Sequence, residues 1–274
     1  IGSECGDLQF YTDGDSIWNF GNFAFNTPPI PLNGSKMATQ TAVILPSRNV
    51  PGDYYFFTVD DTLTQFSNGL CYSELNGASS GMGTWSVTNK SLSKGTNEMI
   101  AAVDHANGKD YWVVSKIKGV PEFHAYLISG VLGVDTNAVV SFAGVSSPES
   151  GQMKFSPDGK FLVIGRPLQI LKFDNSTGEI KDYAAFTASP GDDWIGKGGS
   201  IAFSPSGKKL YVNNYGFSGT QKGLNGIFQF DLESPSVMVL KNTGLSISSP
   251  FEPTGGMQVA PDGKIYIIEQ PNSL

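Results

Sequence analysis

The chain has 274 residues, of which 33 are Gly, 16 are Pro and 12% are aromatic, and its 18 Lys and Arg against 25 Asp and Glu give a net charge of −7. No basic cluster falls on any candidate strand or loop, so nucleic acid and anionic membrane surfaces are poor partners. No run of 18 apolar residues occurs, so we expect no membrane insertion.

Glycine-centred turns recur along the whole chain, and each runs into a segment rich in β-branched and aromatic residues. The turns centre on Gly6, Gly52, Gly108, Gly159, Gly207 and Gly263. Successive glycines are 46, 56, 51, 48 and 56 residues apart. Periods of this length are typical of propeller blades and solenoid repeats, because one small sheet cannot bury its apolar face without a neighbour.

In chain order, the turns predict strands at Leu8–Tyr11, Tyr54–Thr58, Tyr111–Val114, Phe161–Ile164, Leu210–Val212 and Ile265–Ile268. A further strand is expected in several units, at Phe123–Leu127, Ile170–Phe173 and Ile227–Phe230. The segments before the later turns alternate with period two, as at Met153 and Phe155, whereas the segments after them are continuously apolar. This pattern is typical of strands that lie between neighbouring sheets.

The last three turns share one spacing, with Pro157, Pro205 and Pro261 each two residues before Gly159, Gly207 and Gly263. Proline presets φ for a turn, and glycine supplies the positive φ that closes it. Each of these segments therefore predicts a tight hairpin turn at an equivalent place in successive units.

An all-β fold follows, because only 16% of the residues are charged and no stretch has sustained helical periodicity. We predict a β-propeller that forms a single domain over residues 1–274, since the repeats cover nearly all of the chain. A chain of this length buries a large core, so no disulfide, metal or cofactor is required for folding.

Several segments in one order resemble a known family. They include Leu8–Gly14, Tyr54–Asp60, Gly69–Ser73, His105–Val114, Met153–Lys160, Phe173–Gly178 and Ile227–Leu232. The order is similar to that of the N-terminal propeller of large secreted and gliding-associated surface proteins of Bacteroidota, which are type IX secretion substrates. The segment Asn107–Val114 is the most specific part of the resemblance, because Ser-Pro-Asp-Gly-Lys turns also occur in unrelated propellers.

The resemblance implies an extracellular or cell-surface location, associated with the outer membrane. It also implies a protein or glycan partner at the cell surface, and adjoining domains in a longer parent chain. Sorting domains and adhesive repeats that accompany such propellers are not part of this sequence. Within that lineage, Asp15-Ser16-Ile17 and Asp61-Thr62-Leu63 fit an O-glycosylation pattern, so Ser16 and Thr62 are candidate modification sites.

The sequence also departs from the family, because it has neither the strand that precedes the first turn nor the final blade after Asp262-Gly263-Lys264. The six turn units predict six blades, and the family continuation implies a seventh. We therefore expect an incomplete propeller, with an unpaired strand edge or a gap that further residues or a neighbour would fill.

No residue pattern identifies a catalytic or metal site. His105 and His124 could bind a metal or act as acid and base, but no pattern of further ligands accompanies them, so we interpret both as structural. Asp13 and Asp15 resemble the start of a calcium loop whose later ligands are missing, which favours an Asx turn. The adjacent acids Asp60 and Asp61 are interpreted as solvated loop charges.

Tryptophan and cysteine give weaker indications. Trp85 and Trp194 lie in polar, glycine-rich surroundings and are the candidate ligand-binding platforms. Cys5 and Cys71 could pair in an oxidising compartment, although ordinary use of Cys71 as a small apolar residue is favoured.

Three classes of function remain open. The leading hypothesis is a non-enzymatic extracellular module that acts as a scaffold or in binding and adhesion. The second is a propeller enzyme of the lactonase or lyase type, whose site would combine residues from several blades. The third is a structural subunit completed by a partner chain.

Overall fold

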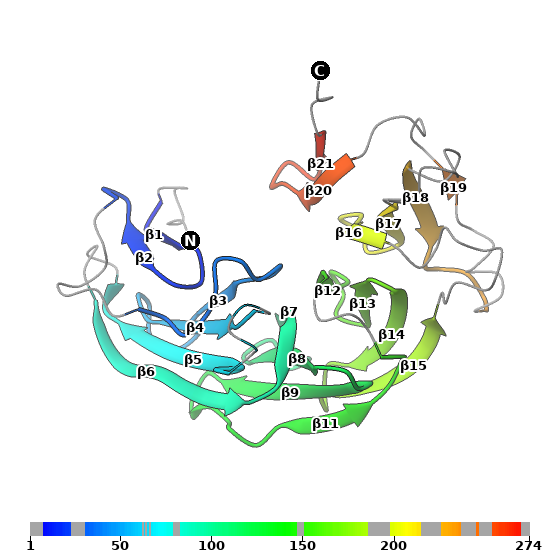
Figure 1. The fold of residues 1–274 in the computed structure, drawn as a ribbon. Helices are drawn as coiled ribbons and strands as arrows, with labels where there is room; N and C mark the ends of the chain where they lie inside the picture. The colour runs from blue at the N-terminus through cyan, green and yellow to red at the C-terminus, as the bar shows by residue number, and fades with distance from the viewer. Residues whose placement is uncertain are drawn as a thin grey trace. The chain divides into compact units, whose positions relative to one another are not determined.

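The computed structural model describes residues 8–22, 31–61, 63, 65, 67–78, 83–146, 151–185, 198–214, 226–236, 245–246 and 254–269. Nearly all regular structure in these residues is β-strand, in six antiparallel sheets (Figure 1). No helix among them could span a membrane.

The strands follow one another through the sheets in chain order. The first sheet is β1 (Phe10–Thr12) and β2 (Ile17–Asn19); the second is β3 (Ala42–Pro46), β4 (Tyr54–Val59), β5 (Leu70–Asn76) and β6 (Thr84–Ser93); the third is β7 (Thr96–Asp104), β8 (Tyr111–Ile117), β9 (Glu122–Ser129) and β10 (Gly133–Val134), with β11 (Val139–Phe142) paired to β9. The fourth is β12 (Met153–Phe155), β13 (Phe161–Gly165), β14 (Leu168–Asp174) and β15 (Glu179–Ala185); the fifth is β16 (Gly198–Phe203), β17 (Lys209–Asn214), β18 (Gly226–Asp231) and β19 (Leu245–Ser246); the sixth is β20 (Thr254–Val259) and β21 (Ile265–Glu269).

This repeated meander is the blade of a β-propeller, and the predicted fold class is confirmed. Each described sheet corresponds to one of the six turn units, because β1, β4, β8, β13, β17 and β21 follow the turn glycines in order. The strands after the later turns extend by one to three residues beyond the predicted bounds, whereas β1 begins at Phe10 instead of Leu8 and ends at Thr12. In the described residues the first and last sheets have two strands each.

The chain divides into two compact units, one of Ile1–Lys118 and Phe123–Val140 and the other of Gly119–Glu122 and Ser141–Leu274. A single domain over residues 1–274, a seventh blade and an incomplete ring with a gap or an unpaired strand edge stay predictions.

In the first unit, adjacent phenylalanines of β4 enter two different cores. Phe57 joins a cluster with Tyr72 and Val113, whereas Phe56 joins a cluster with Phe10. Because side chains alternate across a strand, both faces of β4 are covered, and neither phenylalanine is exposed to solvent. A continuously apolar strand is therefore explained by burial on both faces.

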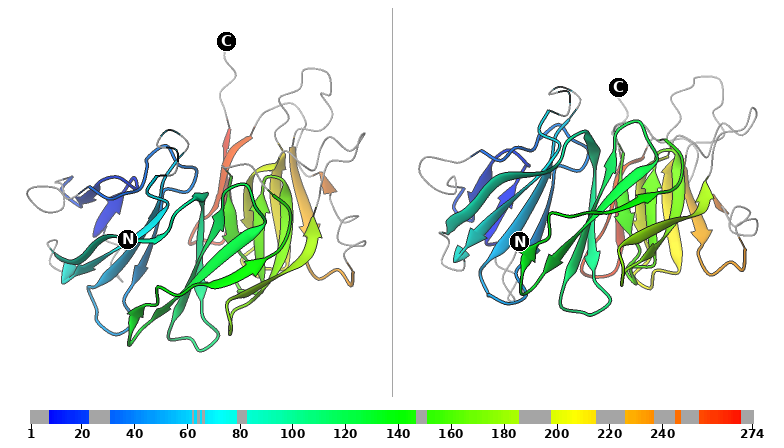
Figure 2. Two further views of the ribbon diagram at one scale, coloured as in Figure 1. Left: turned by 60° about the horizontal axis from the view of Figure 1, so that its bottom comes forward. Right: turned by 90° about the horizontal axis from the view of Figure 1, so that it is seen from below.

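The second unit has its core between the fourth and fifth sheets, which lie face to face (Figure 2). Val163 and Ile170 of the fourth sheet share one buried cluster with Ile201, Leu210 and Phe230 of the fifth. The stacking of blades buries the apolar faces, as the repeat period indicated.

The three Pro-x-Gly segments form tight turns between β12 and β13, β16 and β17, and β20 and β21. Gly159, Gly207 and Gly263 have φ of 69°, 72° and 77°, in the region that favours glycine. Each glycine N–H donates to the carbonyl three residues before it, at 2.8–2.9 Å.

The last turn closes one residue earlier than the other two. Ser204 N donates to the Lys209 carbonyl, whereas Ala260 N donates to the Lys264 carbonyl. The hydroxyl of Ser204 also accepts the N–H of Lys209 at 3.1 Å, as Ser156 does from Phe161 at 2.9 Å. Ala260 has no hydroxyl, so the last turn lacks the side-chain hydrogen bond that accompanies the longer turn at Ser156 and Ser204.

Successive turns also contact one another. A Cβ on Gly207 would lie 3.3 Å from Pro157 Cδ, and one on Gly263 would lie 3.4 Å from Pro205 Cγ. The proline ring of one turn thus packs on the glycine of the next, so the shared spacing serves packing between blades as well as turn geometry.

Candidate functional site

The first unit contains a polar pocket of about 230 Å³. Its walls are the turn between β3 and β4, the adjoining ends of β4 and β5, and the turn between β9 and β10. These elements come from two successive sheets. The carboxylates of Asp53 and Glu74, the phenol of Tyr55 and the amide of Asn76 line it. Because it has two carboxylates and groups that form hydrogen bonds, we call it the acidic pocket.

Strand register places the central pair of this pocket. Tyr55 of β4 is directly opposite Glu74 of β5, so the two side chains lie on the same face of the sheet. Gly133, at the start of β10, faces both of them: a Cβ on it would lie 3.9 Å from Tyr55 Oη and 4.0 Å from Glu74 Oε1. The glycine, with φ of 76°, leaves room in front of this pair.

Both carboxylates keep capacity to accept further hydrogen bonds. Asp53 Oδ1 accepts the N–H of Gly77 at 2.8 Å, and Glu74 Oε2 accepts the hydroxyl of Ser86 at 3.3 Å. The same hydroxyl lies 3.3 Å from Asn76 Oδ1. An ionised carboxylate offers about four lone-pair sites, so each group has acceptor positions available for a ligand.

The electrostatic environment of the pocket is negative. Burial raises the pKa of Tyr55, and the charges of Glu74 and Asp53 raise it further. No Lys, Arg or His is among the described residues that line the pocket. The neighbouring Arg48 is engaged elsewhere, because its guanidinium forms an ion pair with Asp104 and stacks 4.2 Å from the ring centroid of Tyr111.

We expect Glu74→Gln to lower the pKa of Tyr55, because it removes one of the charges that disfavour the phenolate. Burial is the larger cause, so the pKa should remain above that of an exposed tyrosine. The titration of ¹³Cζ-labelled tyrosine by NMR measures this, with Tyr55→Phe to assign the signal. Glu179→Gln, an exposed change in the other unit, is the control; an unchanged Tyr55 pKa in Glu74→Gln would contradict the described geometry.

The second unit has a larger pocket, of about 350 Å³, but with different chemistry. Tyr211, Ile227, Met257 and Ile265 line it, with few groups that could orient a ligand. Close by, Lys154 Nζ donates to the carbonyls of Ile201 at 2.8 Å and Met257 at 3.2 Å, and burial lowers its pKa. The Lys154 side chain therefore joins β12 to β16 and β20, the first strands of three successive sheets.

Of the two tryptophans predicted as ligand platforms, the structure describes Trp85, which does not line the acidic pocket. Trp85, on β6, is half-buried, and its ring lies 5.4 Å from that of Phe56 in an edge-on contact at the rim of a core cluster. Trp194 lies outside the described residues. A ligand-binding role for either tryptophan stays a prediction.

His105 lies in the turn between β7 and β8, and His124 lies on β9. His105 Nδ1 accepts the N–H of Asn107 at 3.0 Å, and its ring stacks on Trp112. His124, on β9, lies 3.4 Å from the hydroxyl of Tyr126. Within the described ranges, no group of three or more His, Cys, Asp or Glu side chains is placed to hold a metal ion.

The interpretation of Asp60 and Asp61 as solvated charges is wrong, because they are 0% and 2% exposed. They follow β4 directly. Asp60 Oδ2 accepts the N–H of Asn68 at 2.9 Å, and Asp61 Oδ2 accepts the hydroxyl of Ser35 at 2.7 Å. These hydrogen bonds offset the cost of burying the carboxylates.

The remaining residues singled out in the sequence are Asp13, Ser16, Thr62, Cys5 and Cys71. Asp13 Oδ1 accepts the N–H groups of Asp15 and Ser16 at 3.1 and 2.8 Å, which is an Asx turn. Ser16 is half-buried, and Thr62 lies outside the described residues. Cys71 is a free, buried thiol whose pKa is raised by burial, and Cys5 lies outside the described residues.

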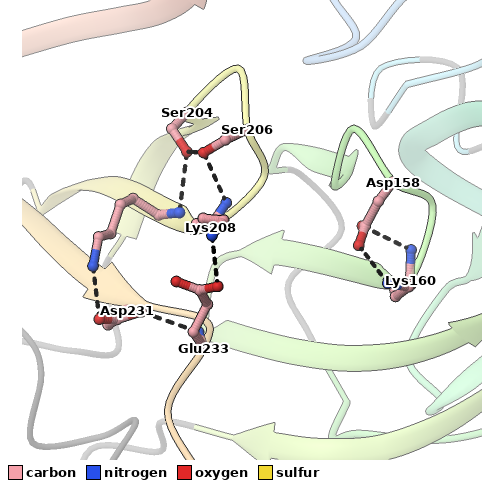
Figure 3. A network of polar contacts seen from close by, with 8 residues as sticks. Asp158, Lys160, Ser204, Ser206, Lys208, Asp231 and Glu233 are labelled. Carbon is pink, nitrogen blue, oxygen red and sulfur yellow. Dashed lines mark hydrogen bonds and ion pairs between the residues drawn. The ribbon is translucent and has the colours of Figure 1, made fainter.

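The turn residues of the fourth and fifth sheets carry a network of polar contacts (Figure 3). Lys209 pairs with Asp231 at 2.6 Å and Lys208 with Glu233 at 2.9 Å, while Asp158 pairs with Lys160 within its own turn at 3.3 Å. The Lys208–Glu233 and Asp158–Lys160 pairs are exposed to solvent and the Lys209–Asp231 pair is half-exposed, so screening by water leaves them little contribution to stability.

Comparison with known proteins supports the β-propeller fold and does not identify a functional site. No family model and no curated protein matches the sequence. An ancestral GH74 enzyme matches in structure with a TM-score of 0.51 and 11% identity, over 96% of this chain and 33% of that chain. This chain therefore spans about a third of that enzyme.

Two further structures are similar at lower scores. The Cps50 (Swd1) β-propeller domain of Myceliophthora thermophila has a TM-score of 0.48 and 10% identity, over 93% of this chain and 74% of that chain. An exo-β-1,3-galactanase from Clostridium thermocellum has a TM-score of 0.47 and 10% identity, over 95% and 58%. At these identities the similarity concerns the fold alone, and it includes both enzymes and a propeller domain without a named activity.

Proposed function

We propose that this chain is a non-enzymatic, extracellular β-propeller module that binds a protein or glycan partner through the acidic pocket and positions adjoining domains of a longer surface protein. The pocket carries the proposal: Tyr55, Glu74 and Asp53 converge in one concave, preformed place. Most ligand sites are concave and have a few placed polar groups, as here. The extracellular setting and the type IX secretion route rest on the sequence resemblance.

A rigid blade scaffold suits such a role. The pocket groups come from strand ends and tight turns instead of long loops, so they are held before a partner arrives. Preorganised groups lose little conformational entropy on binding. The buried clusters beneath β4 and β5 hold Tyr55 and Glu74 in register.

A binding panel tests the proposal. Immobilised protein is incubated with neutral oligosaccharides and with short peptides, and the bound ligands are eluted and their masses are measured by mass spectrometry. We expect at least one class to bind, with a loss of about tenfold or more in Asp53→Asn/Glu74→Gln, because both ligand-accepting charges are removed. The recovered ligand should be chemically unchanged.

Glu179→Gln removes one exposed charge of the other unit and should bind as the unaltered protein does. Binding that is equal in the pocket variant would contradict the assignment of the site. Ligand recovered as cleaved or eliminated product would instead favour the enzyme class of propeller.

A further inference from the structure

The rim of the acidic pocket is aliphatic and exposed. Val50, in the turn between β3 and β4, is 51% exposed, and Val131 and Leu132, in the turn between β9 and β10, are 82% and 88% exposed. Val50 and Val131 line the pocket itself. Single exposed aliphatic side chains are ordinary, but three around one negatively charged pocket form a combined apolar and acidic surface.

The charge of the pocket selects a positive occupant. Two carboxylates line a space without a lining cation among the described residues, and burial together with these two charges raises the pKa of Tyr55. An anionic ligand would be repelled there, whereas a cationic group would gain from both carboxylates in a partly desolvated place. Charge complementarity therefore favours a cation over a neutral group.

The same unit shows how a cation is held by these residue types. Arg48 lies between the carboxylate of Asp104 and the ring of Tyr111. The pocket presents the same two groups, Glu74 beside Tyr55, with Asp53 as a second carboxylate. A guanidinium can stack on the phenol ring while its planar fork donates to a carboxylate, which an ammonium does less well.

We propose that the partner is a polypeptide that inserts an arginine side chain into this pocket and rests flanking aliphatic residues on Val50, Val131 and Leu132. This inference rests on the proposed binding function and names its partner. The arginine supplies the charge recognition, and the aliphatic contacts supply the buried apolar area around it.

The test compares two peptides that differ in one charge. The probes are acetyl-Val-Arg-Leu-amide and the same peptide with citrulline, which is neutral and nearly the same shape as arginine. Titrations followed by ¹H–¹⁵N NMR measure both affinities. We expect the arginine peptide to bind about tenfold more tightly, with an advantage that falls as salt is raised.

Two variants test which residues give the arginine preference and which give the apolar contact. Glu74→Gln should remove most of the arginine advantage, whereas Leu132→Ser should weaken both peptides by about threefold and leave their ratio unchanged, since it alters only the apolar rim. Glu179→Gln is the charge control, and unchanged NMR spectra away from the pocket show that each variant is folded. Equal affinities of the two peptides, or an arginine advantage unaffected by Glu74→Gln, would overturn the inference.

The outcome also separates this inference from the proposed function. A neutral oligosaccharide that binds in a Glu74-dependent manner, with no arginine preference among the peptides, overturns the arginine partner and keeps the pocket as a binding site. Absence of binding by both peptides and by the oligosaccharides overturns both proposals.

Discussion

Gly207→Val should destabilise the protein by roughly 1 to 3 kcal/mol, because a β-branched residue is forced toward positive φ. Gly207 has φ of 72°, and an added Cβ would lie 3.3 Å from Pro157 Cδ, so the new side chain meets the preceding turn as well. Urea unfolding followed by circular dichroism measures the change.

Gly108→Val distinguishes the cost of backbone strain at positive φ from the cost of crowding against Pro157. Gly108 occupies the corresponding turn before β8 with φ of 67°, but nothing lies within 4 Å of its Cβ position. The loss should therefore be smaller at Gly108 than at Gly207, and Pro157→Ala should relieve part of the cost of Gly207→Val. Equal losses at both glycines, unaffected by Pro157→Ala, would contradict contact between successive turns.

Phe56→Ala should cost about 3 to 5 kcal/mol, the range for removing a fully buried phenylalanine. Phe56 is 0% exposed, and its ring lies 5.4 Å from Phe10 and 5.4 Å from Trp85. Because Phe10 belongs to β1, amide exchange in β1 and β2 should rise with the loss of stability.

Phe142→Ala is the matched control, since Phe142 is 71% exposed and its removal should change the unfolding free energy by less than about 0.5 kcal/mol. A loss below about 1 kcal/mol in Phe56→Ala would contradict the packing of the first sheet on the second.

The sequence predicted most of the fold, because its signals are local. Turn glycines need positive φ, and the apolar segments that follow them are buried strands at Tyr54–Val59 and Phe161–Gly165. In the last strand, by contrast, Tyr266 and Ile267 are 57% and 39% exposed. The one-residue difference at the last turn was not predicted, although Ala260 stands where the other two turns have a serine whose hydroxyl accepts a backbone N–H.

The acidic pocket could not be predicted, because its groups are distant in sequence. Asp53, Glu74 and Gly133 meet only through the register of β4 with β5 and the position of the following hairpin. No short motif encodes such a meeting. The one available signal was Asp53-Tyr54-Tyr55 directly after a predicted turn, which places an acid and a tyrosine at a strand end.

Adjacent acids misled the sequence reading for a related reason. Asp60 and Asp61 are polar and follow a strand, which is typical of exposed loops. Their burial depends on Ser35 and Asn68, which approach through the tertiary fold. Charge alone therefore indicated exposure, whereas the hydrogen-bond partners decided burial.

The most direct test of the binding pocket is hydrogen–deuterium exchange with and without the ligand that the panel identifies. We predict protection confined to three segments, 53–55, 74–76 and 130–133, and its loss in Asp53→Asn/Glu74→Gln at the same ligand concentration. Protection at saturating ligand that lies elsewhere, with these three segments unchanged, would contradict the pocket as the binding site.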